Sequence, residues 1–185
     1  MKIPSANSQS DNSLLEPLPG QLLLVVAPRA GGPIMMNLVA HLAGRGPLRL
    51  LDGGNFFDLR AVARALRRQA PDLSAALERI QLARAFTCHQ MVTLLKEAPA
   101  QPVPTLVLDL LSTFYDESVP ASESLRLLET CLGHLRRLNQ LAPVAVSARP
   151  APTESRPELL HSLQAAAGQI WRLEPYLPPP PPRLF

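Results

Sequence analysis

The sequence predicts an α/β fold, a mainly parallel sheet flanked by helices, and two observations lead to this prediction. Short apolar runs alternate with longer segments of helical periodicity, the arrangement that builds parallel sheets through right-handed crossovers. In addition, 185 residues suffice for one buried core, and no change in composition separates two parts of viable size. We therefore expect one core domain, over residues 20–174.

The two ends of the chain differ from this core in composition. Residues 1–19 are rich in Ser, Asn and Pro without periodicity, which predicts a disordered head. Residues 175–185, PYLPPPPPRLF, are predicted to adopt polyproline II, as a stiff spacer or as a ligand for an aromatic groove. Between these roles we favour an inert terminus, because bare proline runs are common compositional features.

The predicted strands are the short apolar runs of the core. In chain order they cover Leu22–Val26, Leu48–Leu51, Ile80–Ala85, Thr105–Asp109, Val144–Ser147 and Gln169–Leu173.

Between the strands lie segments with helical periodicity. The fourth of them repeats Leu125, Leu128, Leu132 and Leu135 at three- and four-residue spacing, a stripe that must cover the sheet or a partner. Ser122 is the expected N-cap of this helix. The predicted helices are Ile34–Leu42, Leu59–Gln69, Cys88–Glu97, Glu123–Leu141 and Pro157–Ala166.

The segment LLLVVAPRAGGPIMMNLVAHLA has the pattern of a buried strand, a glycine-bearing turn and an amphipathic helix. In a phosphate loop, G-x-x-x-x-G-K-[ST], backbone amides hold phosphates, the Lys neutralises their oxygens and the hydroxyl binds magnesium. The four defining positions of that pattern are Ala27, Gly32, Pro33 and Ile34 in this chain, so only one glycine remains. Two interpretations stay open: a phosphate loop that has lost its binding side chains, or an ordinary tight connection in which Gly31 and Gly32 supply permissive backbone angles.

Composition favours a protein of a reducing compartment. Cys88 and Cys131 are too few for a disulfide framework and lie in apolar-periodic segments, where a thiol packs as a small hydrophobe. The first ten residues lack the apolar stretch of a secretory signal, and no run approaches the roughly 20 apolar residues of a membrane span. We expect a cytoplasmic protein without a membrane partner.

The net charge of the chain is +3, with sixteen Arg and two Lys. This charge is compatible with binding to nucleic acid but does not argue for it.

Four segments, taken in order, resemble the RecA/RadA recombinase superfamily, especially the archaeal and eukaryotic recombinases and their paralogues. The second is the most specific, an alanine-arginine-alanine core with an aromatic and then His-Gln before a helix, and the third is similar to a Walker B strand ending in Asp109. The resemblance covers roughly residues 20–174 and implies a RecA-like ATPase core. The segments are LRLLDGGNFFDLRAVARAL, ERIQLARAFTCHQMVTLL, TLVLDLLSTFYDE and LETCLGHLRRLNQLAPVAVSARP.

The chain also departs from this family at positions that matter for catalysis. The family carries a Glu beside the second strand that activates water. In this chain the segment DGGN, from Asp52 to Asn55, has no carboxylate at the position of that Glu. The family carries a Gln after the strand that ends in Ser147, whereas Arg149 stands here. A Walker B aspartate holds magnesium, but without the Lys and hydroxyl opposite it a polar strand end is the favoured role of Asp109.

Two further groups of residues, a set of arginines and two Cys-His pairs, have simple expected roles. Arg60, Arg64, Arg67 and Arg68 are expected on one helix face, opposite Leu59, Val62, Ala63 and Leu66, where they face solvent by default or contact phosphates as the alternative. Cys88 with His89, and Cys131 with His134, lack paired zinc-finger spacing, so no metal site is expected.

The sequence therefore predicts a degenerate RecA-like protein without autonomous ATP hydrolysis and without a cofactor. It would act as an accessory or scaffold in DNA recombination or repair, with an active recombinase or a DNA polymerase as protein partner and DNA as a possible one. Arg149 and the segment to Arg156 are the candidate interface or DNA-facing residues. One alternative is an atypical ATPase that binds ATP with magnesium through Arg29, Gly31, Gly32 and Asp109, and another is an interaction module unrelated to DNA.

Overall fold

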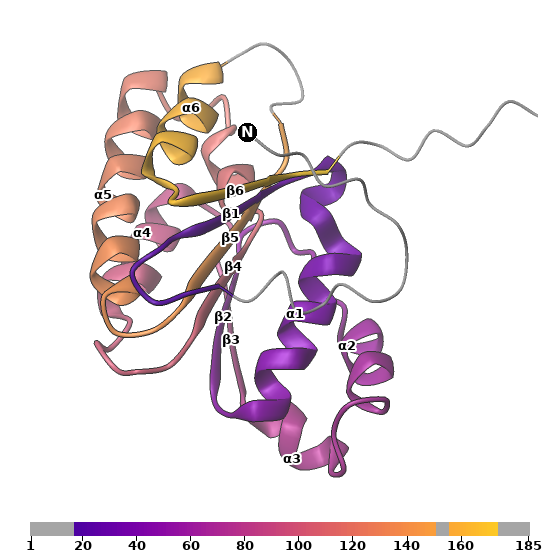
Figure 1. The fold of residues 1–185 in the computed structure, drawn as a ribbon. Coiled ribbons are helices and arrows are strands. Elements are labelled where there is room, and N and C mark those ends of the chain that lie inside the picture. Colours follow the sequence, from indigo (N-terminus) through magenta and orange to yellow (C-terminus); the bar gives the residue numbers. More distant parts are fainter. Residues whose placement is uncertain (1–16, 151–155, 174–185) are drawn as a thin grey trace, which may run out of the picture.

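A computed structural model of the chain describes residues 17–150 and 156–173. These residues form an α/β fold around one six-stranded, all-parallel sheet with the strand order β3-β2-β4-β5-β1-β6 (Figure 1). The predicted fold class is thus confirmed as a parallel sheet flanked by helices. The predicted tail and residues 1–16 of the predicted head lie outside the described residues.

Burial of the strands follows from their position in the sheet. Every residue of β1, β2, β4 and β5 is buried, because helices cover both faces of the central strands. The outer strands β3 and β6 are partly exposed, as expected for strands with one free edge. The strands are β1 (Leu23–Val26), β2 (Leu48–Asp52), β3 (Ile80–Arg84), β4 (Thr105–Leu108), β5 (Val144–Ala148) and β6 (Gln169–Arg172).

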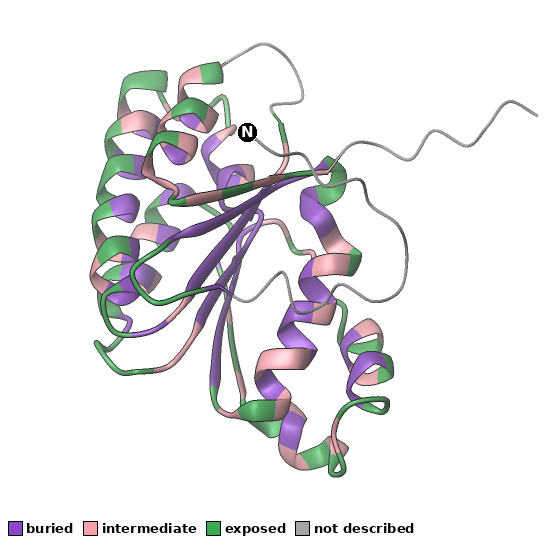
Figure 2. Cartoon of the chain, viewed as in Figure 1, coloured by how far each residue is buried: buried purple, intermediate pink, exposed green. Residues whose placement is uncertain are grey.

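Helices form a layer on each face of the sheet, and each layer closes its own core (Figures 1 and 2). One layer contains α1 (Gly32–Arg45), α2 (Leu59–Leu66) and α3 (Leu73–Glu78), and it packs on alternate strand residues such as Leu23 and Leu50. The other contains α4 (Cys88–Glu97), α5 (Ala121–Asn139) and α6 (Pro157–Ala166). Short 3-10 segments, η2 (Pro28–Gly31) and η3 (Leu110–Phe114), follow β1 and β4.

Most predicted elements are present with small shifts at their ends, and α4 and α6 have the predicted bounds. The leucine stripe of α5 does cover the sheet, since Leu128, Leu132 and Leu135 are buried in the core. Helix α3 was not predicted, because its six residues are too few to show a helical period.

Three predictions of detail are wrong. Helix α5 begins at Ala121 after Pro120, so Ser122 lies inside the first turn and is not its N-cap. Leu59 is 53% exposed at the start of α2, where no element covers the first residue of the helix, and is therefore not on the buried side. Strand β4 ends at Leu108, and Asp109 leaves the extended conformation with φ 48° and ψ 56°.

Arginines close helix ends in this fold. The guanidinium of Arg137 donates to the carbonyls of Leu95 (3.1 Å) and Ala98 (2.9 Å) at the end of α4. Arg79 reaches the carbonyls of Ala43 (3.4 Å) and Gly44 (3.2 Å) near the end of α1. Each cation lies where the last carbonyls of a helix have no partner inside it and the helix dipole is negative. These two arginines therefore have a structural role.

Within residues 17–150 and 156–173, no helix has both the length and the apolar character needed to cross a membrane.

Candidate functional site

Polar side chains gather at the carboxyl edge of the sheet, around the ends of β2, β4 and β5. The helix after β2 leaves to one face of the sheet, whereas those after β4 and β5 leave to the other. The carboxyl edge of a parallel sheet opens at such a switch point, which is where α/β proteins commonly bind ligands. Asp52, Asp109, Ser147 and Arg149 lie at this place, and we treat them as the candidate site.

Asp109 is the most constrained residue of the site. Its backbone is left-handed, a conformation that costs a non-glycine residue on the order of 1 kcal/mol or more. The surrounding structure holds it there, because its amide donates to the Ser147 hydroxyl (3.0 Å) and its carbonyl accepts from the Ser112 amide (3.1 Å). The residue is fully buried. A strained, buried carboxylate at a switch point is typical of functional sites.

Arg149 from the end of β5 is the counter-ion of this carboxylate. Its Nε lies 3.0 Å from Asp109 Oδ2 and forms an ion pair with it, although neither atom makes a hydrogen bond to any residue that the structure describes. The backbone amide of Arg149 donates to Asp109 Oδ1 at 3.3 Å. The same guanidinium donates to the Ser112 hydroxyl (2.9 Å) and lies 5.3 Å from the centre of the Phe56 ring. Burial raises the pKa of Asp109, and the charge and amide of Arg149 offset only part of that rise.

Two glycines after β2 let the chain close over Asp109. A Cβ added at Gly54 would lie 2.6 Å from Asp109 Oδ2 and would also overlap the ring of Phe56. A Cβ at Gly53 would lie 3.0 Å from the Asp109 carbonyl oxygen, and the Gly53 amide donates to Leu108 (2.9 Å). The β2–α2 loop therefore forms a cover directly on the carboxylate, which only residues without a side chain permit.

Asp52 holds this cover in position. Its two carboxylate oxygens accept from the amides of Phe56 (3.0 Å) and Phe57 (3.1 Å), and Arg84 Nε from β3 lies 3.5 Å from Oδ2. Asp52 thus serves as the anchor of a loop, and both of its oxygens are in use.

Beside this pair, two buried hydroxyls have no hydrogen-bond partner in the described part of the chain, those of Thr113 and Tyr115. Burial and then the negative charge of Asp109 raise the pKa of Tyr115 to about 12, so this phenol stays protonated at neutral pH. Unpaired buried polar atoms are rare, and here they occur on Asp109 and Arg149 and on two residues that follow Asp109 by four and six positions. The region therefore differs from an ordinary strand end.

The turn after β1 is built differently from a phosphate loop. Arg29, Ala30 and Gly31 are all left-handed, with φ of 52°, 50° and 65°. Two amides of this turn are used inside it, because the Ala30 amide donates to the Ala27 carbonyl (3.0 Å) and the Gly32 amide donates to the Arg29 carbonyl.

Helix α1 then begins at Gly32, and its second residue, Pro33, has no amide proton. At Gly31 an added Cβ would come within 3.1 Å of Val25, so this glycine is required by packing as well as by its φ. The Arg29 side chain is exposed and makes no hydrogen bond or ion pair with the described residues.

The structure brings some predicted site residues together and keeps others apart. Asp109 and Arg149 are in contact, but the turn after β1 and Asp109 are separated by the width of β5, two strand spacings or about 10 Å. Arg156 donates to the carbonyls of Phe114 (2.8 Å) and Val119 (2.7 Å), and further to the Asp116 carbonyl and the Ser124 hydroxyl. Its guanidinium is therefore occupied within the chain, and its contact with DNA or a partner stays a prediction.

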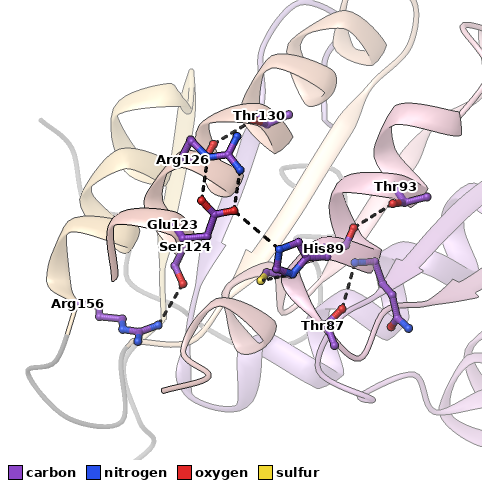
Figure 3. A network of polar contacts seen from close by, with 10 residues as sticks. Thr87, His89, Thr93, Glu123, Ser124, Arg126, Thr130 and Arg156 are labelled. Atoms are coloured by element: carbon purple, nitrogen blue, oxygen red, sulfur yellow. Dashed lines mark hydrogen bonds and ion pairs between the residues drawn. The ribbon is translucent and has the colours of Figure 1, made fainter. Parts of the chain in front are cut away.

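A second polar network connects the starts of α4 and α5 (Figure 3). Glu123 receives two hydrogen bonds from Arg126 (2.6 and 2.9 Å) and lies 3.8 Å from His89 Nε2. Hydrogen bonds from Arg126 lower the pKa of Glu123. At the start of α4 the Thr87 hydroxyl accepts from the Gln90 amide (3.2 Å), as an N-cap does. Because these groups are exposed and paired with one another, the network ties two helices together and is not a separate site.

The site residues that the sequence did not reveal are Gly53, Gly54, Phe56 and Ser112. Paired glycines directly after the aspartate of a strand are a usable signal of close backbone approach, but nothing in the sequence says that the approach is to Asp109. The described residues contain no group of three or more His, Cys, Asp or Glu that could hold a metal ion. The guanidinium of Arg149 and the loop at Gly54 already lie against the carboxylate of Asp109, so this arrangement does not suit a magnesium ion with a nucleotide.

Comparison with known proteins adds no family to this picture: no family model matches the chain, and no curated protein is significantly similar to it.

Proposed function

We propose that this chain is a RecA-like domain that does not hydrolyse ATP by itself and that acts as an accessory or scaffold in DNA recombination or repair. The four segments that resemble the RecA/RadA superfamily support this proposal, and so does the parallel sheet in which those segments become β2, β3, β4 and β5 with their neighbouring helices. The role in DNA metabolism rests on the resemblance.

The observation that carries the loss of ATPase activity is the state of Asp109. An aspartate that binds Mg²⁺ with a nucleotide must present free carboxylate oxygens toward the phosphates. Here Arg149 of the same chain lies 3.0 Å from Oδ2, and the Gly53–Gly54 loop covers the same oxygen. The positive charge that a metal would supply is thus already supplied by the protein.

The turn after β1 supports the same conclusion independently. Pro33 stands where the lysine of a phosphate loop would stand, and Ile34 stands where the hydroxyl would stand, so neither the ammonium nor the metal ligand is present. The inward hydrogen bonds of Ala30 and Gly32 use further amides. With neither Asp109 nor the turn after β1 arranged to hold a nucleotide, the exposed surfaces are the parts of the molecule left for function, which is why we propose a binding protein.

Calorimetric titration of the purified chain with ATP and Mg²⁺ tests the loss of nucleotide binding. We expect no binding tighter than about 1 mM, a free energy of about −4 kcal/mol. The variant Arg149→Met should behave the same, because removing the guanidinium does not restore Pro33 and Ile34 to Lys and Ser. Micromolar binding that Asp109→Ala abolishes would establish the alternative, an atypical ATPase, and overturn the proposal.

The scaffold role is tested by purifying the full chain with its native partners and identifying them. The proposal expects an active recombinase or a DNA polymerase at stoichiometric level. A solitary monomer that retains neither such a partner nor DNA contradicts it.

A further inference from the structure

The outer face of α2 carries an unusual concentration of positive charge. Arg60 and Arg64 lie on the helix, Arg67 is its C-cap residue and Arg68 continues the last turn. At 3.6 residues per turn these positions share one face, over about 12 Å of helix axis. Residues 58–70 contain these four arginines and one aspartate, a net charge of +3 that equals the net charge of the whole chain.

No other part of the described chain neutralises this face. The side chains of all four arginines are exposed and make no ion pair or hydrogen bond with residues 17–150 or 156–173. Asp58, the nearest acid in sequence, accepts from the amides of Arg60 (2.9 Å) and Ala61 (3.1 Å) as the N-cap of the helix. By contrast, Arg49, Arg79, Arg84, Arg126, Arg137, Arg149 and Arg156 all have partners within the chain.

The arrangement also opposes the stability of a short helix. Arg64 stands four residues from Arg60, three from Arg67 and four from Arg68, so like charges meet at each neighbouring position of this face. The helix is held in place by its other side, where Val62, Ala65 and Leu66 are buried against α1. Positive charges that repel one another lie together on this surface, and no acidic side chain of the described chain neutralises them. Such a surface is suited to binding an external polyanion.

The chemistry of the surface favours nucleic acid over an acidic protein. From Leu59 to Gln69 the exposed residues are the four arginines, Gln69 and, at the first position of the helix, Leu59, so a single apolar side chain accompanies four positive charges. Protein interfaces have an apolar core, whereas nucleic-acid interfaces are polar and strongly positive. Arginine, in addition, presents a planar fork that fits phosphate oxygens.

We infer that the arginine face of α2, formed by Arg60, Arg64, Arg67 and Arg68, binds the phosphodiester backbone of nucleic acid without reading its sequence. The inference deepens the proposed function, on which the choice of DNA as the probe rests. It places the contact on the helix after β2, on residues other than Asp109 and those of the turn after β1.

Fluorescence anisotropy with a labelled 30-nucleotide single strand and the matching duplex, in the absence of ATP, tests this inference. Four phosphate contacts predict a slope of about −3.5 for log K against log salt on duplex, and a loss of affinity of about a hundredfold between 50 and 200 mM salt. The triple variant R60Q/R64Q/R68Q should lower the steepness of that slope by about 2 to 3. The two DNA forms show whether one strand is sufficient.

The matched control is K96Q/R136Q/R172Q, which removes the same number of positive charges from exposed side chains elsewhere on the molecule. It should keep the wild-type slope, and far-ultraviolet circular dichroism should show that both triple variants are folded. R60K/R64K/R68K should retain most of the binding, since phosphate contacts depend first on charge.

Three results overturn the inference: no binding by the wild-type chain at 50 mM salt, equal losses in R60Q/R64Q/R68Q and in its control, or equally strong retention of polyglutamate in place of DNA. The last result identifies an acidic protein surface as the partner. None of these results alters the ATP titration, whereas micromolar ATP binding overturns the proposed function whatever the anisotropy shows.

Discussion

At the scale of single residues, Asp109 has an unfavourable backbone conformation and an unfavourable environment. It is buried, it adopts a left-handed backbone, and it carries a charge that the interior disfavours. Arg149, Ser147 and Ser112 offset these costs through an ion pair and hydrogen bonds. Removing any one of these partners leaves the remaining costs in place.

The pH dependence of stability should reveal the raised pKa of Asp109. Because burial raises this pKa in the folded state, the contribution of Asp109 to stability is full below the ordinary aspartate pKa of about 3.9 and is lost as the pH rises through the raised value. Asn does not titrate. We therefore expect the free energy of unfolding of Asp109→Asn, minus that of the wild type, to increase from pH 4 to pH 7 in urea denaturation.

Asp116 provides a control of opposite sign. Hydrogen bonds from Ser118 lower the pKa of this exposed carboxylate, so its contribution is present above the ordinary aspartate pKa and is lost on acidification. The difference measured for Asp116→Asn should therefore fall slightly as the pH rises. A pH-independent difference for Asp109→Asn would show that the burial of Asp109 does not perturb its titration.

The close approach of the β2–α2 loop to Asp109 predicts a specific cost for Gly54→Ala. The added Cβ has no room beside Asp109 Oδ2 and the Phe56 ring, so we expect a loss of about 2 kcal/mol in the free energy of unfolding. Gly133→Ala is the matched control, because this exposed position of α5 has no atom within 4 Å of the added Cβ. It should stabilise by about 0.5–1 kcal/mol through helix propensity. Equal effects of the two variants in urea denaturation would rule out the tight cover.

At the scale of elements, helix ends are closed by distant arginines as well as by local caps. Arg137 of α5 binds the end of α4, and Arg79 binds the end of α1. In both contacts the arginine lies outside the helix whose end it closes, so each contact connects two elements. Each also costs the conformational entropy of one long side chain.

Loss of the contact from α5 to α4 should be measurable. Arg137→Met removes the donor to the carbonyls of Leu95 and Ala98, and we expect it to lower the free energy of unfolding by about 2 kcal/mol in urea denaturation. Arg136→Met, one residue earlier and exposed without a partner in the described chain, should change it by less than about 0.5 kcal/mol. Similar effects of both variants would mean that the bonds of Arg137 do not stabilise α4.

At the scale of the whole molecule, the sheet separates two cores that each depend on its integrity. Cys88 of α4 and Cys131 of α5 are both free and lie in the core that α4, α5 and α6 close. Burial raises the pKa of Cys88 and raises that of Cys131 to about 12, so neither forms a thiolate at neutral pH in the folded protein.

Thiol labelling should therefore report global unfolding. With Ellman's reagent at pH 8, we expect both cysteines to react promptly in denaturing urea and neither to react in the native protein faster than the protein unfolds. Rapid labelling of one thiol under native conditions would instead indicate that the layer of α4 and α5 opens locally.

Much of the architecture could be predicted from the sequence, since strands and helices are encoded by local apolar periodicity. The six strands and five of the helices followed from it, whereas the six-residue α3 and the left-handed turn of Asp109 did not. Exposed arginines on α2 were predicted as well, because one helix face is a local property.

The sequence by itself determined the α/β class and the absence of Lys and a hydroxyl at Pro33 and Ile34, because both are local facts of residue type and order. Only the tertiary structure decided that Asp109 is neutralised and covered. Arg149 reaches it from 40 residues away, and Gly54 approaches it from the end of another strand. Neither contact has a periodicity or spacing of its own, since both arise from the order in which parallel strands assemble.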